Sequence, residues 1–157
     1  MARHTTAAAV DLGWADAVEL AGRLLRGASL AHLELGDLPA GERATLETTL
    51  TYEQQCTRGE ARRGEASPAD VVVTDRRILV SRPLRGLLSL WHVDLENLQL
   101  GVTGQQCHLD LHPVGINPRV RLTGEAAPMV ALHVAHAVFP STWARLSGLL
   151  PLLDCAA

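Results

Sequence analysis

The 157-residue sequence predicts a mainly β domain with flanking helices: a seven-stranded antiparallel barrel or sandwich, capped by a C-terminal α-helix and preceded by an extra N-terminal helix. Three observations predict this fold class. Seven short segments in the middle of the chain have the alternating or β-branched composition that is typical of strands. No helical pattern interrupts them, which favours antiparallel pairing. Before and after them, apolar residues recur at helical spacing.

The composition is that of a globular chain with an aliphatic core. Apolar residues make up 47% of it, but only three Trp, one Tyr and one Phe are aromatic, so surfaces on which bases or sugars could stack are scarce. The net charge of −3 argues against a nucleic-acid partner. Cys56, Cys107 and Cys155 are odd in number and widely spaced, which favours free thiols in a reducing compartment. With no recognisable signal or membrane-spanning segment, we expect a cytoplasmic protein.

The N-terminal part predicts one helix and a connector. Residues 1–10 are expected to be disordered. Apolar residues recur at helical spacing from Trp14 to Leu25, and Gly27 is well placed to end the helix. The connector after it is expected to contain a helical turn at Leu30–Leu35. Residues 11–37 therefore form a helical extension that precedes the β domain.

The central part predicts the seven strands. Alternation is clearest in the first, Ala44–Cys56, and a long polar loop at residues 57–68 follows it. Asp75 and Arg76 join the next two strands tightly. The six further strands are predicted at Val71–Thr74, Ile78–Ser81, Leu90–Leu95, Leu98–Thr103, Gln106–His112 and Arg119–Thr123.

The C-terminal part returns to helical spacing. A stripe of apolar residues at helical spacing runs from Met129 to Phe139 and predicts a helix. Pro128 is tolerated in its first turn, and Pro140 ends it. Residues 140–157 form a tail, in which Ser141–Leu150 is expected to add a short helix.

Three segments resemble bacterial pleckstrin-homology-like (PH-like) and GRAM-like domains. The segment Val71–Val80, VVVTDRRILV, is similar to a hairpin motif of these domains. The segment Leu90–Leu100 resembles the strand pair that usually follows it, and Pro39–Glu42 is similar to the turn that enters the first strand. The resemblance covers residues 38–139. It implies a PH-like domain that serves as a lipid-binding, peptide-binding or oligomerisation platform, a choice that the fold alone does not decide.

One candidate site is a basic surface between residues 58 and 85, where seven Arg and four acidic residues give a local charge of +3. In lipid-binding PH domains this region holds a phosphorylated headgroup, so the resemblance implies anionic lipid as an alternative ligand. Glu60 and Glu65 offset the positive charge, which favours an ordinary solvated loop. Arg85–Leu88 could add an apolar tip that enters a membrane, or could begin the next strand. The candidate anion-binding residues are Arg58, Arg62, Arg63, Arg76 and Arg85.

The second candidate site is a protein interface formed by the N-terminal helix and the tail, whose leucine-rich faces exceed what one small barrel can cover. It favours a protein partner or a homo-oligomer, hence an adaptor or self-assembly function. We expect no nucleic acid and no small-molecule substrate, and a membrane surface is the less favoured partner. The candidate interface residues are Trp14, Leu24, Leu25, Trp143, Leu146, Leu149 and Leu150.

No motif indicates catalysis, a metal or a cofactor. The sequence lacks a nucleophile elbow, a phosphate-binding loop and an HExxH helix, so we expect no enzyme. His108, Asp110 and His112 share one strand face, but we expect Arg119 and Arg121 to pair with Asp110 there, which opposes a metal. His133 and His136 lie three apart on the last helix. For that pair we expect one packed and one solvated ring.

Overall fold

The computed structural model describes residues 13–55, 66–115 and 119–156. The helix α2, Trp14–Leu25, is followed by the strands β1 (Ala44–Gln55), β2 (Ser67–Thr74), β3 (Arg77–Arg82) and β4 (Gly86–Trp91). The short 3-10 turn η1 (His92–Asp94) leads into β5 (Leu95–Thr103), β6 (Gln106–Pro113) and β7 (Arg119–Thr123). The chain ends with α3 (Ala127–Val138), the 3-10 turns η2 (Trp143–Arg145) and η3 (Ser147–Leu149), and α4 (Leu150–Ala156).

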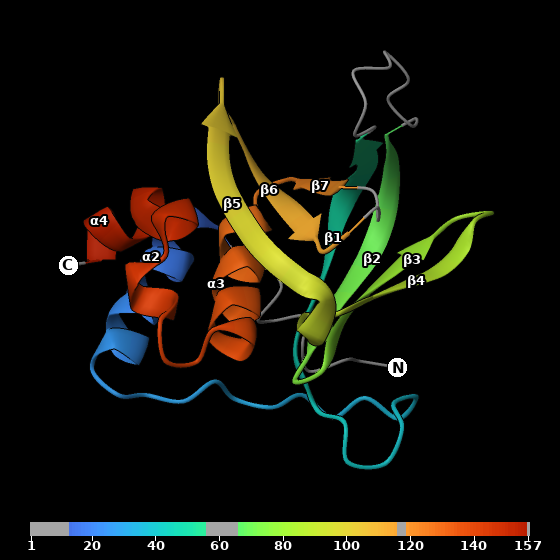
Figure 1. The fold of residues 1–157 in the computed structure, drawn as a ribbon, viewed down its shortest axis with the longest axis horizontal. Coiled ribbons are helices and arrows are strands. Elements are labelled where there is room, and N and C mark those ends of the chain that lie inside the picture. The colour runs from blue at the N-terminus through green and yellow to red at the C-terminus, as the bar shows by residue number, and fades with distance from the viewer. Residues whose placement is uncertain (1–12, 56–65, 116–118, 157) are drawn as a thin grey trace.

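The seven strands form one antiparallel sheet in the order β4-β3-β2-β1-β7-β6-β5. The long strand β1 is shared: its first part pairs with β2 and its last part pairs with β7. No pairing joins β4 to β5 among the described residues, so the sheet is a curved sandwich rather than a closed barrel. Figure 1 shows the helices gathered on one side and the β3–β4 hairpin extending away from them. The fold class predicted from the sequence is confirmed.

Helix α3 forms the centre of the core. It contacts β1, β2, β5, β6 and η1, and each of its first nine residues, from Ala127 to Ala135, is buried. Burial on all sides, rather than on one stripe, follows because α2 covers the helix face that the sheet leaves open.

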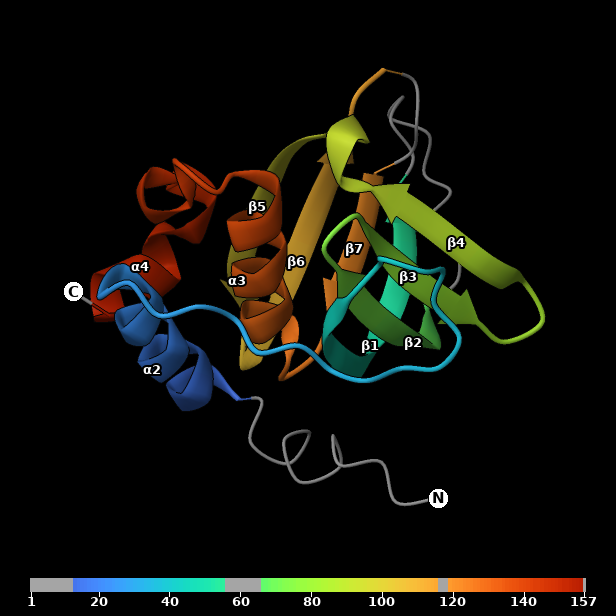
Figure 2. The same ribbon diagram turned by 90° about the horizontal axis from the view of Figure 1, so that it is seen from below.

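The tail and the N-terminal helix pack on each other and on this core. Helix α2 contacts both α3 and α4, and η3 lies against β5. A side chain at Gly148 would collide with the Leu98 carbonyl oxygen, so glycine is what lets the tail lie directly on the β5 backbone. The leucine-rich faces of the two extra segments are thus largely covered by each other (Figure 2).

The structure corrects three predicted elements. Leu30–Leu35 forms no helical turn, because Leu33 instead makes a bridge to Ala44. The predicted strand Leu90–Leu95 is the end of β4 followed by η1. The tail helix covers Leu150–Ala156, and residues 143–149 form two 3-10 turns rather than one helix. The expected disorder of residues 1–10 and the predicted loop residues 57–65 lie outside the described residues.

Within the described ranges, no helix is long and apolar enough to span a bilayer.

Candidate functional site

Three residues that carry the PH-like resemblance, Glu42, Thr74 and Arg77, come together in one polar cluster beside the β2–β3 turn. Glu42 precedes β1, Thr74 ends β2 and Arg77 begins β3. Arg77 Nε donates to Glu42 Oε2 at 2.9 Å, and its Nη2 donates to Oε1 at 3.2 Å, so the pair is bidentate. The Glu42 side chain is only 1% exposed and that of Arg77 is 15% exposed. Burial acts to raise the pKa of Glu42, but hydrogen bonds and positive charge from Arg77 outweigh it and lower the pKa below its usual value.

Thr74 holds the turn together. Its hydroxyl donates to Glu42 Oε2 at 2.7 Å and accepts from the backbone N–H groups of Arg76 and Arg77. The Thr74 carbonyl accepts from the His92 ring at 2.8 Å, which places the ring proton on Nε2, since a carbonyl can only accept. Burial lowers the pKa of His92, so the ring is neutral at pH 7.

The cluster also fixes the end of β4. The Arg77 guanidinium lies over the Trp91 ring at 4.7 Å from its centroid, and Nη1 donates to Ser89 Oγ. These contacts join three segments: the turn before β1, the β2–β3 hairpin and the turn η1. The three segments are far apart in the sequence, and their spacing does not predict that they meet. Glu42, Thr74 and Arg77 bond to one another, which gives these signature residues a role in holding the fold, whereas the buried Nδ1 of His92 has no hydrogen-bond partner among the described residues.

The predicted basic residues do not form one surface among the described residues. Arg76 lies at the β2–β3 turn and Arg85 at the β3–β4 turn, and a whole strand, β3, separates them. Arg58, Arg62 and Arg63 lie outside the described residues. Because Asp70 pairs with Ser81, β1 ends and β2 begins at the end of the sheet where Arg85 lies.

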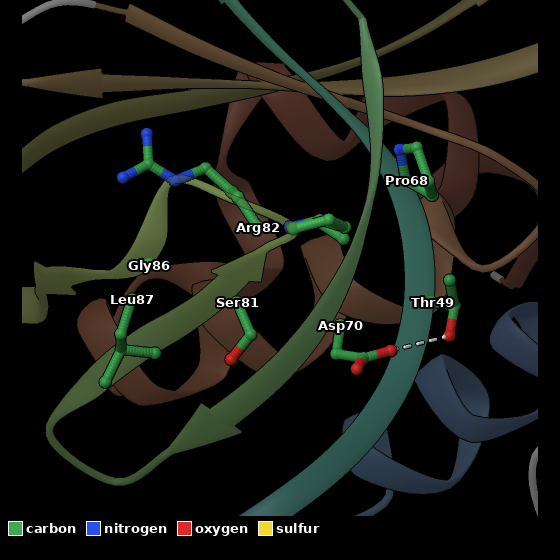
Figure 3. A pocket seen from close by; sticks show the side chains of 9 residues that line it. Thr49, Pro68, Asp70, Ser81, Arg82, Gly86 and Leu87 are labelled. Atoms are coloured by element: carbon green, nitrogen blue, oxygen red, sulfur yellow. Dashed lines mark hydrogen bonds between the residues drawn. The ribbon is translucent and has the colours of Figure 1, made fainter.

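A hollow of about 410 Å³ lies at this end of the sheet and is lined by residues of β1, β2, β3 and β4 (Figure 3). Asp70 Oδ1 accepts from the Thr49 hydroxyl there, and the Arg82 guanidinium points away from that bond. Arg82 lies over the Tyr52 ring, and its buried Nε has no hydrogen-bond partner. Of the described residues, one carboxylate and one guanidinium line the hollow, and no nucleophile faces a general base among them. Its chemistry is that of a mixed-charge surface.

The predicted interface residues divide by burial. Leu24, Trp143 and Leu149 are buried within the chain, so for these three the structure gives an intramolecular role. Trp14 and Leu146 are half-buried, whereas Leu25 and Leu150 stay exposed. A charge placed at Leu149 would therefore test folding rather than association.

Exposed apolar side chains concentrate instead along the β3–β4 hairpin. Of the eight exposed large apolar residues in the described part of the chain, four lie between residues 84 and 93: Leu84, Leu87, Trp91 and Val93. Leu84 is also the one described non-glycine residue with positive φ, at 65°, a strained conformation for leucine. In the sequence, the uncharged run GLLSLW at residues 86–91 was the signal for this strand. Because the strand was predicted to begin at Leu90 rather than at Gly86, the sequence did not show which of its side chains are exposed.

The histidines and carboxylates find ordinary partners. Of the two arginines predicted to pair with Asp110, Arg121 holds it in a bidentate pair with distances of 2.8 and 3.0 Å. His133 is buried against Thr45 and His136 is half-buried near Trp143. In the described ranges, no three His, Cys, Asp or Glu side chains gather as metal ligands would.

The sequence matches no protein-family model, and it matches no curated protein. Among solved structures, it is similar to the C-terminal domain of an unknown protein from Leishmania infantum, with a TM-score of 0.46 and 9% identity over 65% of this chain and 88% of that one. It is also similar to the Vps36 N-terminal PH domain, with a TM-score of 0.44 and 18% identity over 64% of this chain and 82% of that one.

Proposed function

We propose that this chain is a non-enzymatic protein-interaction or self-assembly module. The observation that carries the proposal is the apolar free edge at β4. Among the described residues, this strand pairs with β3 alone, and it carries exposed Leu87 and Trp91 beside exposed Leu84 and Val93. An edge strand presents unpaired N–H and C=O groups, and proteins use such edges to add a strand from a partner.

A photo-reactive amino acid at position 87 tests this proposal. Leu87 is 59% exposed, so the replacement leaves the core intact, and we expect irradiation in the native cell to attach a protein to this position. Val102 on β5 is the matched control, because it is 55% exposed and apolar but lies on the strand at the far end of the sheet. Cross-linking that is equal at both positions, or absent at position 87, would contradict the role of the β4 edge in this function.

Leu25 and Leu150 offer a second apolar surface for the same function. They are the two predicted interface residues that stay exposed, on α2 and α4, which contact each other. The same photo-reactive group at position 150 would report a partner on this helical side, as first expected from the sequence.

Anionic lipid binding is the second candidate function. It is favoured by the unpaired Arg82 Nε and by the position of Arg85 at the end of the sheet from which the Arg-rich loop leaves. Each basic residue near an anionic leaflet contributes about 1 kcal/mol, and Asp70 in the same hollow opposes an anion, so this candidate ranks second. If it is right, the chain co-sediments with phosphatidylserine vesicles at low salt, and both physiological salt and the Arg62→Glu, Arg63→Glu double variant release it.

A further inference from the structure

We infer that β4 pairs with β4 of a second copy of this chain, in antiparallel orientation about a two-fold axis, to make one continuous sheet across the dimer. This inference rests on the proposed function and names its partner. It begins from the position of the strand. β4 is the last strand on its side of the sheet, and Figure 2 shows no described segment covering its outer edge.

The composition of β4 lacks the features that protect edge strands. Native edges are blocked by charged side chains, by proline, by bulges or by a covering segment. Gly86–Trp91 has no charged residue and no proline, and its pairing with β3 runs without a register shift from Arg77–Trp91 to Arg82–Gly86. The edge is therefore regular, uncharged and ready to accept a further strand.

The side chains of β4 suit a copy of themselves. A two-fold axis perpendicular to the sheet places the outer faces of both copies on the same side of the joined sheet. Each outer-face residue of one β4 must therefore lie opposite an outer-face residue of the other β4. Leu87, Ser89 and Trp91 alternate along the strand and share the outer face. An axis through Ser89 sets Leu87 opposite Trp91 of the second copy, and Ser89 opposite Ser89. Two exposed apolar contacts are then buried, one on each side of the axis, and aromatic–aliphatic cross-strand pairs stabilise sheets.

Charge also favours a second copy in this orientation. The segment begins at Arg85 and ends beyond Trp91 at Asp94, and both residues are exposed. Antiparallel alignment brings the Arg85 end of one copy to the Asp94 end of the other, and it does so twice. A parallel alignment would place like charges together. Opposite charges fix the register of an interface more than they add to its affinity.

Variants at Ser89 test the pairing, because only this residue meets its own equivalent. We expect the full chain to show twice its 16.8 kDa mass in analytical ultracentrifugation. Ser89→Lys and Ser89→Glu should each return the mass to one chain, since each sets two like charges face to face; both also replace the hydroxyl that accepts from Arg77 Nη1, so each variant must first be shown to be folded. An equimolar mixture of the two variants should restore the double mass, because lysine then faces glutamate. Leu87→Lys should also dissociate the dimer, and Val102→Lys, the matched exposed control, should not.

Several results would overturn the inference. One is a wild-type chain that stays at single mass at concentrations of hundreds of micromolar. Another is a dimer that survives both Ser89 variants and Leu87→Lys while thermal melts show that these variants are folded. If position 87 still cross-links to a different protein, the interaction function stands and only the self-pairing fails. If neither position 87 nor position 150 cross-links to any protein, the proposed function itself fails.

Discussion

Replacement of Arg77 by alanine is expected to lower the free energy of unfolding at pH 7 by about 3 kcal/mol, at the lower end of the range for removing one partner of a buried ion pair. The variant leaves the Glu42 carboxylate, whose side chain is 1% exposed, without its bidentate partner. It also removes the guanidinium from the face of Trp91. Urea unfolding followed by circular dichroism measures the loss.

The loss should depend on pH in a defined direction. In the native chain the pKa of Glu42 is lowered, so the pair stabilises the fold above the carboxyl's ordinary value of 4.5, and this stabilisation falls away as the pH drops below it. In the Arg77→Ala variant, burial without the partner raises the pKa of Glu42, and acid then neutralises the stranded charge. The difference between native and variant chains should therefore be smaller at pH 4 than at pH 7.

Two further variants separate the ion pair from a general effect of losing an arginine. Arg76→Ala removes the neighbouring, exposed arginine and should cost about 0.5 kcal/mol or less. Adding Glu42→Gln to Arg77→Ala should recover part of the loss at pH 7, because no buried charge remains. An equal loss from Arg76→Ala and Arg77→Ala, or a loss independent of pH, would contradict the structural account of the cluster.

Acid is expected to destabilise the chain through His133, before its carboxylates titrate. Burial, with a smaller contribution from the charge of His136, lowers the pKa of His133 to about 4. The unfolded chain, with an ordinary histidine pKa near 6.5, then binds more protons than the folded chain between pH 6.5 and 4. Stability therefore falls as the pH drops through this window, by about 2 kcal/mol from this residue at pH 5.

Unfolding free energies at pH 8, 6 and 5, compared between the native chain and His133→Gln, measure this contribution. The variant should show a shallower fall in stability with acid, whatever its stability at pH 8. His32→Gln is the control for removing a histidine side chain at an exposed position. Nuclear magnetic resonance of the His133 ring supplies a second measurement that needs no variant. A ring that titrates near 6.5 in the folded chain would contradict the prediction.

Local patterns predicted most of the elements because the relevant signals are local. Alternation in β1, the glycine at position 27 after α2 and Pro140 after α3 each act within a few residues, and those elements lie close to where they were expected. The misplaced elements depend on contacts between distant segments. His92 leaves the strand pattern because its ring bonds to Thr74 and its N–H bonds to Arg76. Leu33 likewise departs from the predicted helical turn because it forms a bridge to the distant residue Ala44.

The candidate sites were harder to predict because they depend on strand register. The sequence grouped Arg76 with Arg85 by proximity along the chain, but a strand between two turns carries them to opposite ends of the sheet. It likewise counted Leu149 as surface, since no local pattern shows that η3 lies against β5. In contrast, the segment Val71–Val80 forms the predicted hairpin because its turn is local, and Thr74 and Arg77 within it bond to Glu42.

The tail on β5 has a consequence for stoichiometry. A sheet with two uncovered edge strands could add copies of the chain at both edges and grow into a fibre, as open edges do in aggregates. Here Gly148 brings the tail onto the backbone at Leu98, so strand addition is hindered at that end. If two copies pair through β4 as inferred above, each uses the same patch, and the tail hinders further addition at β5 near Leu98, so we expect the assembly to close at two chains.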